Sequence, residues 1–474
     1  MIRRSGPGGS SPAKKIAATE KTPINSVGQD ALCTIFSLLG IFDLVRCSVV
    51  CKFWYKIINQ KKLLQQFCCK HFANHGGLHD EPDISKKPWR FRLEELVMEH
   101  QKLSLTRGRV TIDQWKGHSI GVNQCRMKMG TILTGVGDKV MRLWSVESYK
   151  CLEEYSVPDT VSLVDFDFDE SKVSVTICFC IKNYQRQDEE GCPASFSPSQ
   201  SGALYLCDLL AHSIVGLIGT QLCLWRRNGQ RSIFPPRAGT FPKGLCMRYL
   251  DPEAVIGCED GSIRVFDMYS RKCSRIMRMH PGPVTCLSLS DDQFVFSGSS
   301  AGTIKVSHLS SDACVTTLRT PDITGIKALC YNPRSGLVFA GSSAGYVSCL
   351  DFRNRRKLWE LRVSPSVLYS LGHMQNDDST LVVGGMDGAL HVLDQKTGEG
   401  LCSYVMDNTA ASTSSGTVER RKGRRLSVDD YNSLIDKIPR TARPPVTCLA
   451  VGKNKVVTTQ GKYIRLWKFT GHEL

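Results

Sequence analysis

The sequence predicts a small all-α module followed by an all-β propeller of seven blades. Apolar residues recur at helical spacing between residues 27 and 54. A strand, turn, strand pattern then recurs about every 40 residues from Val122 onward, a period typical of solenoids, propellers and arrays. The pentapeptide Gly-Ser-Ser-Ala-Gly also occurs twice, at 298–302 and 341–345, which itself indicates an internal repeat.

The composition of the 474-residue chain, 41% hydrophobic and 22% charged, is typical of an ordinary soluble globular protein. No apolar run reaches the roughly 18 residues of a membrane helix, so no membrane partner is expected. Residues 1–22 are basic and lack an apolar core, which predicts a disordered tail rather than a signal peptide. The 21 cysteines show no zinc-finger spacing, so we expect reduced thiols and no metal.

The net charge of +16 allows nucleic acid, an acidic partner or only a solvated surface. No stripe of alternating basic and aromatic residues follows the chain, so nucleic acid is not the expected partner. A propeller that associates with nucleic acid stays as an alternative, and it would bind with a steep salt dependence.

The first module is predicted over residues 23–72, with Gly40 breaking its first helix and Asp43 capping its second. Its sequence resembles the F-box, the helical motif that docks on the adaptor subunit of SCF-type cullin ubiquitin ligases. The likeness rests on Asp30-Ala31-Leu32 before Ile35-Phe36-Ser37, on Asp43-Leu44, and on Val50-Cys51-Lys52-Phe53-Trp54. Val27-Gly28 departs from the usual Leu-Pro at the start of the motif.

The resemblance implies that this module binds the SCF adaptor and, through it, a cullin. The residues expected to bury into the adaptor are Leu32, Ile35, Phe36, Leu39, Leu44, Val49, Val50, Cys51 and Trp54. A helical hairpin that only packs on the propeller is the alternative. Residues 73–108 are predicted to be a linker that contains a helix beginning at Trp89.

The propeller is predicted over residues 109–470. The Gly-Ser-Ser-Ala-Gly stretches match the serine elbow of esterases, but each leads into a strand pattern rather than the helix that such an elbow needs. The repeats resemble the WD-repeat family: Gly117-His118 matches its Gly-His, and Leu143-Trp144 and Leu466-Trp467 stand at its Trp-Asp pair. Cysteines at matching repeat positions, Cys125, Cys246, Cys286 and Cys448, are expected to fill the core.

The second blade is predicted to carry an insertion at 173–213 within a hairpin. When that segment is left out, the spacing from Val161 to Trp225 falls from 64 residues to 23, close to the 22 between Val122 and Trp144. A lineage-specific loop and a translated intron are both open interpretations. At the ring's closure, the strand-like residues 109–115 are expected to complete the last blade, which would remove an open sheet edge.

Between the sixth and seventh blades, residues 406–445 are polar and predict a flexible basic loop. Within it, Arg420, Arg421, Lys422, Arg424 and Arg425 fit a nuclear import signal. Arg424 and Arg425 before Ser427 fit the pattern of a phosphorylation site for a basophilic kinase.

Taken together, the two resemblances imply a non-catalytic substrate-recognition subunit of an SCF-type ligase, in the cytoplasm or the nucleus. The propeller would bind an unknown target protein, with no cofactor. The turns at the expected binding face lack arginine, so phosphate reading is not expected there. The alternative is a non-enzymatic propeller scaffold for protein–protein interaction.

Overall fold

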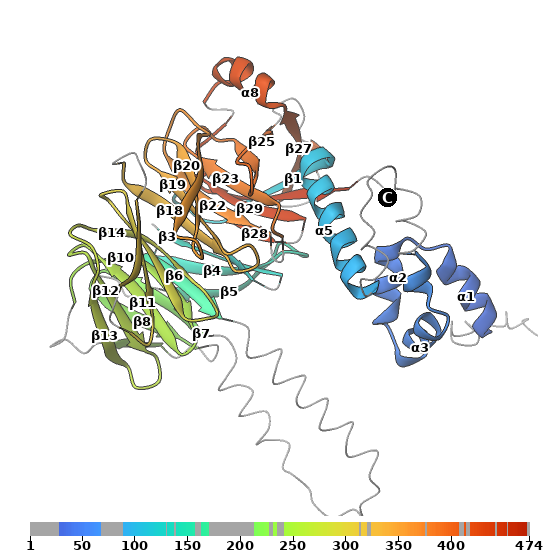
Figure 1. The fold of residues 1–474 in the computed structure, drawn as a ribbon, viewed down its shortest axis with the longest axis horizontal. Helices are drawn as coiled ribbons and strands as arrows, with labels where there is room; N and C mark the ends of the chain where they lie inside the picture. The colour runs from blue at the N-terminus through green and yellow to red at the C-terminus, as the bar shows by residue number, and fades with distance from the viewer. Residues whose placement is uncertain are drawn as a thin grey trace, which may run out of the picture. The chain divides into compact units, whose positions relative to one another are not determined.

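A computed structural model describes residues 28–67, 89–128, 130–136, 139–156, 163–169, 213–226, 231–234, 241–311, 314–319, 324–374, 377–406, 412–413, 418–440, 443–452 and 454–471. The chain forms two compact units, residues 1–97 and 98–473. Figure 1 colours them along the chain, and each is described by itself. The predicted tail at 1–22 and all of the insertion at 173–213 except Ser213 lie outside the described residues.

The first unit consists of helices α1 (Gln29–Ser37), α2 (Ile41–Ser48), α3 (Lys52–Gln60) and the start of α5 (Trp89–Arg107). Gly28 precedes α1 as its N-cap residue. The cap predicted for α2 is wrong: Gly40 is the N-cap, and Asp43 lies in the first turn, 3.0 Å from Arg46. One core holds the helices together, formed by Leu32, Phe36, Ile41, Leu44, Ile57, Ile58, Leu64 and Leu96.

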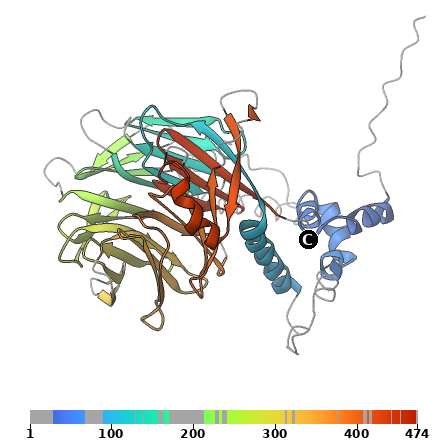
Figure 2. The same ribbon diagram turned by 90° about the horizontal axis from the view of Figure 1, so that it is seen from above.

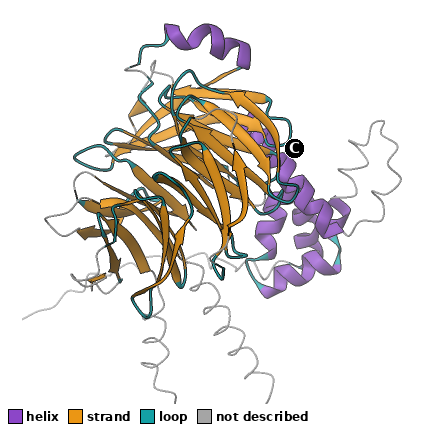
Figure 3. Ribbon diagram, turned by 60° about the vertical axis from the view of Figure 1, so that its left-hand side comes forward, coloured by secondary structure: helices purple, strands orange, loops and turns teal. Residues whose placement is uncertain are grey.

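The second unit is a propeller of four-stranded antiparallel blades (Figures 1 and 3). Its first five blades are β2 (Gln124–Lys128) to β5 (Cys151–Ser156), β6 (Leu163–Asp169) to β9 (Arg231–Phe234), β10 (Gly244–Leu250) to β13 (Lys272–Arg278), β14 (Val284–Leu289) to β17 (Cys314–Arg319), and β18 (Ile326–Asn332) to β21 (Arg356–Arg362). The strands between these bounds are β3 (Thr131–Val136), β4 (Val140–Ser145), β7 (Ser213–Ile218), β8 (Gln221–Trp225), β11 (Glu253–Cys258), β12 (Ser262–Asp267), β15 (Phe294–Ser299), β16 (Thr303–His308), β19 (Leu337–Ser342) and β20 (Tyr346–Asp351).

The interrupted hairpin of the second blade is closed in the structure. Strand β6 pairs with β7 from Leu163 opposite Ile218 to Asp169 opposite Ser213, so the chain between them leaves and re-enters the blade at one end. Both Gly-Ser-Ser-Ala-Gly stretches form turns between paired strands, one between β15 and β16 and one between β19 and β20. Gly302 and Gly345 adopt positive φ there, at +72° and +87°, which favours glycine.

The sixth and seventh blades are joined into one sheet. The sixth is β22 (Leu368–His373), β23 (Thr380–Gly385), β24 (Leu390–Asp394) and β25 (Gly400–Met406). The seventh is β28 (Cys448–Gly452), β29 (Lys455–Gln460), β30 (Tyr463–Thr470) and β1 (Arg109–Lys116), so the strand from the N-terminal side completes the last blade, as predicted. Strand β27 (Val418–Leu426) pairs with β25 on one side and β1 on the other.

The prediction of a flexible loop over 406–445 is therefore wrong for most of its length. Residues 418–426 form β27, with the two-residue strand β26 (Ser412–Thr413) beside it, and α8 (Val428–Leu434) and the 3-10 helix η4 (Ile435–Lys437) follow. Figure 2 shows α8 and β27 beside the last blades. The polar composition that suggests a loop is tolerated in a strand because β25 and β1 supply hydrogen-bonding edges on both sides.

A buried carboxylate anchors β27 to the seventh blade. Asp113 on β1 accepts hydrogen bonds from Arg420 at 2.9 Å and Tyr149 at 2.7 Å, and its other ion pair, with Lys468, is 2.8 Å long. Burial alone would raise the pKa of Asp113, but the bonds from Lys468, Tyr149 and Arg420 lower it below its ordinary value. Asp113 is therefore ionised at neutral pH and connects three strands.

Residues of the repeat signature hold single blades together. His118 lies 2.8 Å from the Thr134 hydroxyl, and the Trp144 indole donates to the same oxygen at 2.9 Å. The repeat-position cysteines Cys125, Cys246, Cys286 and Cys448 are all buried, as predicted. Two of these thiols also connect blades, because Cys246 donates to the Val284 carbonyl and Cys448 to the Cys125 carbonyl of the next blade. These groups are therefore structural.

Candidate functional site

The helical unit exposes large apolar side chains on its surface. Leu38 is 82% exposed at the end of α1, and Val49 and Val50 are 81% and 63% exposed in the turn between α2 and α3. Ile35 and Phe53 are also exposed, in α1 and α3. An apolar side chain of this size loses about 1.5–3 kcal/mol of favourable transfer free energy by staying in water. Large apolar side chains exposed on these two short segments make the segments a candidate contact surface for another protein.

The structure changes the role of three predicted docking residues. Leu32, Phe36 and Leu44 are 1–2% exposed and form the unit's own core, so they cannot contact an adaptor directly. Leu39 and Trp54 are partly buried against the same core, and the Trp54 ring meets that of Phe36 edge-on, with centroids 5.2 Å apart. Of the predicted set, Ile35, Val49 and Val50 are exposed.

Cys51 has a local structural role. It is the N-cap residue of α3, and its sulfur accepts a hydrogen bond from the backbone N–H of Trp54 at 3.5 Å. A helix N-terminus leaves backbone donors without partners, and a capping side chain satisfies one of them. Cys51 thus sets where α3 begins, directly after the exposed Val49-Val50 turn.

The basic residues predicted as a nuclear signal lie on β27. Arg420 pairs with Asp113, and Arg421 lies 3.1 Å from Glu419. Lys422, Arg424 and Arg425 are on the same strand, and Arg424 and Arg425 are exposed. Strand β27 is paired with β25 and β1, so an import receptor would have to recognise these residues within a sheet. The nuclear signal stays a prediction.

Ser427 starts α8. Its hydroxyl accepts from the Asp430 N–H at 3.1 Å and lies 2.8 Å from the Asp430 carboxylate, a complete capping box. The side chain is exposed, whereas the preceding residues Arg424 to Leu426 pair with β25. Phosphorylation of Ser427 stays a prediction too.

A second candidate site lies in the channel of the propeller. The first strand of each blade contacts the first strand of the next, and β28 contacts β2, so these seven strands line the central channel. Three of these inner strands, β2, β6 and β10, carry charged side chains where apolar residues would be expected. Asp165 on β6 is 2.9 Å from Arg126 on β2 and 3.4 Å from Arg248 on β10.

Asp167 lies one pleat further along β6, 3.2 Å from Lys128. Each carboxylate also accepts a hydrogen bond from a backbone N–H group: Met247 donates to Asp165 at 2.9 Å, and Tyr249 donates to Asp167 at 3.1 Å. Burial alone would raise the pKa of Asp167, yet Lys128 and Arg126 hold it below its ordinary value. Asp167 is therefore ionised at neutral pH, and the cluster consists of mutually paired acidic and basic side chains.

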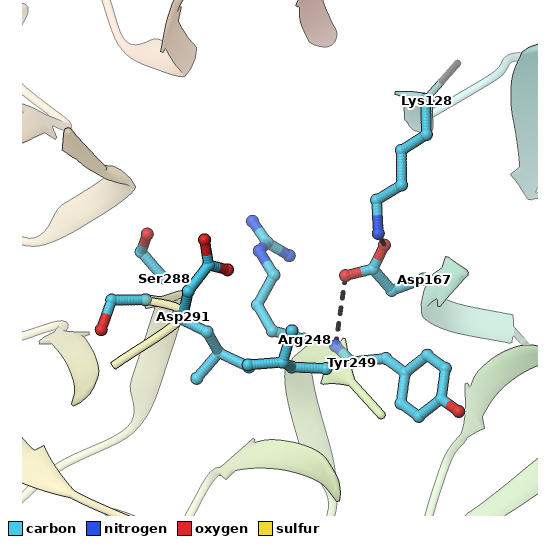
Figure 4. A pocket seen from close by; sticks show the side chains of 9 residues that line it. Lys128, Asp167, Arg248, Tyr249, Ser288 and Asp291 are labelled. Atoms are coloured by element: carbon cyan, nitrogen blue, oxygen red, sulfur yellow. Dashed lines mark hydrogen bonds and ion pairs between the residues drawn. The ribbon is translucent and has the colours of Figure 1, made fainter. Parts of the chain in front are cut away.

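These strands end around a cavity of about 200 Å³, shown in Figure 4. In this view the Arg248 side chain extends into the open space between Asp291 and Asp167. Strands from the first four blades contribute to the lining, which consists of Lys128, Asp167, Arg248, Tyr249, Leu250, Ser288, Leu289, Ser290 and Asp291.

Sequence reasoning missed this cluster, although a signal for it is present. The predicted inner strands read Cys-Arg-Met-Lys from Cys125, Val-Asp-Phe-Asp from Val164, and Met-Arg-Tyr from Met247. Charges in three consecutive inner strands alternate with apolar residues, which places them on one face. The ring brings these faces together at the channel.

Among the described residues, neither a helix that could span a membrane nor a group of side chains that could hold a metal ion is found. No helix there is both long and apolar enough to cross a bilayer. Within the same residues, no three His, Cys, Asp or Glu side chains gather in a way that could hold a metal ion.

A helical unit with an exposed apolar surface followed by a propeller defines a protein-interaction subunit. Comparisons with known proteins agree with this class. The F-box-like family profile matches residues 29–70, and the profile of the WD domain, G-beta repeat, matches residues 271–306. An F-box/WD-40 repeat-containing protein of Arabidopsis thaliana is 48% identical over 471 residues, which cover 98% of each chain. The chain belongs to the F-box/WD-repeat family.

Proposed function

We propose that the chain is a substrate-recognition subunit of an SCF-type ubiquitin ligase. In this role the F-box unit docks on the SCF adaptor, which links it to a cullin, and the propeller binds the target protein. The chain itself performs no chemistry: its contribution is to raise the effective concentration of the target beside the transfer machinery. We expect it to act in the cytoplasm, the nucleus or both.

The exposed apolar surface of the F-box unit carries the proposal. Leu38 and Val49 are more than 80% exposed, although isolated apolar side chains at that exposure bring no benefit to the folded unit. Their burial by a partner would be favourable at about 25 cal/mol per Å² of apolar area. A scaffold whose helical unit had no partner would gain nothing from this exposure.

The test is co-purification of the full-length chain with the SCF adaptor. Wild type is compared with Leu38→Asp and Val49→Asp, which place a charge on the surface without touching the core. We expect each variant to lose most of the adaptor, since a docked carboxylate would be desolvated without a partner. The Leu44→Ala and Trp54→Ala changes are poor tests, because both remove core contacts of the unit.

Leu358→Asp provides the matched control. Leu358 is 49% exposed and lies on β21 of the propeller, so its change adds the same charge elsewhere. Adaptor retained by this variant and lost by Val49→Asp supports the proposal. Adaptor absent from wild type, or retained by both F-box variants, would favour the scaffold alternative.

A further inference from the structure

We propose that Cys125 and Cys448 are a redox-active thiol pair, which hydrogen peroxide converts into a disulfide that closes the ring of the propeller covalently. The two residues lie on the first strands of the first and the last blade, β2 and β28. The pair involves no residue of the F-box unit, so the inference goes beyond the proposed function and does not depend on it.

The two side chains meet where the first and last blades pack together. The Thr447 hydroxyl, next to Cys448, donates to the Val122 carbonyl at 2.9 Å and so holds the two strands side by side. The Cys448 sulfur lies 3.5 Å from the Cys125 carbonyl oxygen, and the two thiol groups are hydrogen-bonded to each other. Two thiols in contact can be bridged without a large movement of the backbone.

The surroundings favour a thiolate at one sulfur of the pair. Arg126 Nη1 lies 3.9 Å from the Cys448 sulfur. The hydrogen bond from Cys125 and the charge of Arg126 lower the pKa of Cys448 to about 6, although burial and the Asp165 carboxylate act in the opposite direction. The same hydrogen bond, together with burial, raises the pKa of Cys125 well above its ordinary value. At neutral pH Cys448 is therefore the nucleophile, and Cys125 is the thiol that keeps its proton.

A second cysteine pair at the same repeat positions allows a direct comparison. Cys246 on β10 and Cys286 on β14 also lie on neighbouring first strands, and the Cys246 sulfur is 3.5 Å from the Val284 carbonyl oxygen. Burial raises the pKa of Cys286 to about 12 and that of Cys246 well above its ordinary value. Both thiols therefore stay protonated at neutral pH. The two pairs occupy equivalent places in the fold but differ in the charge of one sulfur.

The oxidation consumes one molecule of hydrogen peroxide. The Cys448 thiolate attacks a peroxide oxygen, the O–O bond breaks, and the leaving hydroxide takes up the proton that Cys448 had released and becomes water. The Cys125 sulfur then attacks the sulfenic acid sulfur: the S–S bond forms, the S–O bond breaks, and the hydroxyl leaves as water with the Cys125 proton. Two electrons pass from the two sulfurs to the peroxide. Because Cys448 is 5% exposed and Cys125 is fully buried, the oxidant has to be small.

The disulfide would join the two ends of the ring. In the reduced chain, pairing of β1 with β30 completes the last blade without a covalent link. The new bond joins residues 323 positions apart, and a cross-link over so long a loop removes conformational freedom from the unfolded chain. We expect the thermal midpoint of the propeller to rise by roughly 5 °C on oxidation.

The test treats the reduced full-length chain with increasing amounts of hydrogen peroxide and maps its cysteines by mass spectrometry without reduction. Trypsin releases Cys125 in residues 117–126 and Cys448 in residues 441–453, and each peptide contains no other cysteine. We expect these two peptides to become linked, with the loss of two hydrogen atoms.

The second pair and an exposed thiol provide the controls. At the peroxide dose that links Cys125 to Cys448, we expect Cys246 and Cys286 to stay reduced. Equal linking of the control pair would contradict the role assigned to the thiolate. Oxidation of the exposed Cys151 while Cys125 and Cys448 remain thiols would overturn the proposal.

Substitutions separate the two steps. Cys125→Ser keeps a hydrogen-bond donor beside the nucleophile but removes its partner, so oxidation should stop at the Cys448 sulfenic acid, which dimedone traps. Cys448→Ser should abolish both the linked peptide and the rise in thermal midpoint, whereas the control Cys286→Ser should keep both. A rise that persists in Cys448→Ser, or no dimedone adduct in Cys125→Ser, would contradict the assignment. The adaptor takes no part in these measurements, so their outcome is independent of whether the F-box docks.

Discussion

The two units of the chain depart from the usual distribution of polarity in opposite directions. The F-box unit leaves Leu38, Val49 and Val50 in water, whereas the propeller buries Asp165 and Asp167 among cations. Elsewhere apolar side chains fill nine cores in the described residues, and most charges are exposed. The exposed apolar side chains gain nothing in the isolated chain, and the buried carboxylates depend on cations placed beside them, so both regions are candidates for function.

The largest expected effect is a loss of propeller stability when a buried carboxylate of the channel is removed. Asp165→Ala removes the carboxylate between Arg126 and Arg248 and leaves Arg126, whose side chain is 15% exposed, without its counter-charge. We expect the free energy of unfolding of the propeller to fall by about 3–5 kcal/mol. Urea titration followed by tryptophan fluorescence measures this loss, and a change below about 1 kcal/mol would show that the pair is not needed for stability.

Leu44→Ala tests the core of the F-box unit. Leu44 is 2% exposed, and its truncation should cost about 2–5 kcal/mol through lost burial and the cavity left behind. Protease sensitivity of residues 28–67 in the full-length chain reports this loss. A variant as resistant as wild type would mean that Leu44 is free to serve a partner, as the sequence alone suggested.

Low pH should affect the two regions differently, because the carboxylate of Asp167 is buried in the channel and no carboxylate is buried among the described residues of the F-box unit, 28–67. The pKa of Asp167 is lower in the folded chain than in the unfolded one, so its stabilisation is present above the unfolded pKa of about 4 and disappears as pH falls through the folded value. Asp167→Asn should be less stable than wild type at pH 7 by about 1–3 kcal/mol. Thermal unfolding at several pH values should show this difference shrinking below pH 4; a constant difference would contradict it.

Val49→Asp should have the smallest effect on folding. The side chain is 81% exposed, and a surface substitution of this kind changes stability by about 0.5 kcal/mol or less. Its thermal midpoint should match that of wild type while adaptor binding is lost. A destabilisation as large as that of Leu44→Ala would place Val49 in the fold rather than on the surface.

Much of the propeller can be predicted from sequence because its period is local. The blade spacing, the interrupted hairpin and the closing strand before the first repeat all follow from alternating residues and turn positions. Strand β27 does not, because its run of basic residues has no strand pattern of its own. Its conformation depends on the edges of β25 and β1, which are far from each other in sequence.

The F-box surface was predicted less well for a different reason. Helical periodicity shows which residues are apolar on one face, but it does not distinguish the unit's own core from a partner's interface. Phe36 and Leu38 are two positions apart in sequence, yet they are 2% and 82% exposed. The difference in exposure arises from tertiary packing, because α1 packs against α3 and buries Phe36 there.

Hydrogen–deuterium exchange of the full-length chain, with and without the SCF adaptor, tests the central claim most directly. The account predicts slower exchange in peptides that cover residues 35–39 and 46–53 when the adaptor is present, with the propeller unchanged. Protection confined to the propeller, or no protection at either segment at saturating adaptor, would contradict docking through the exposed apolar surface.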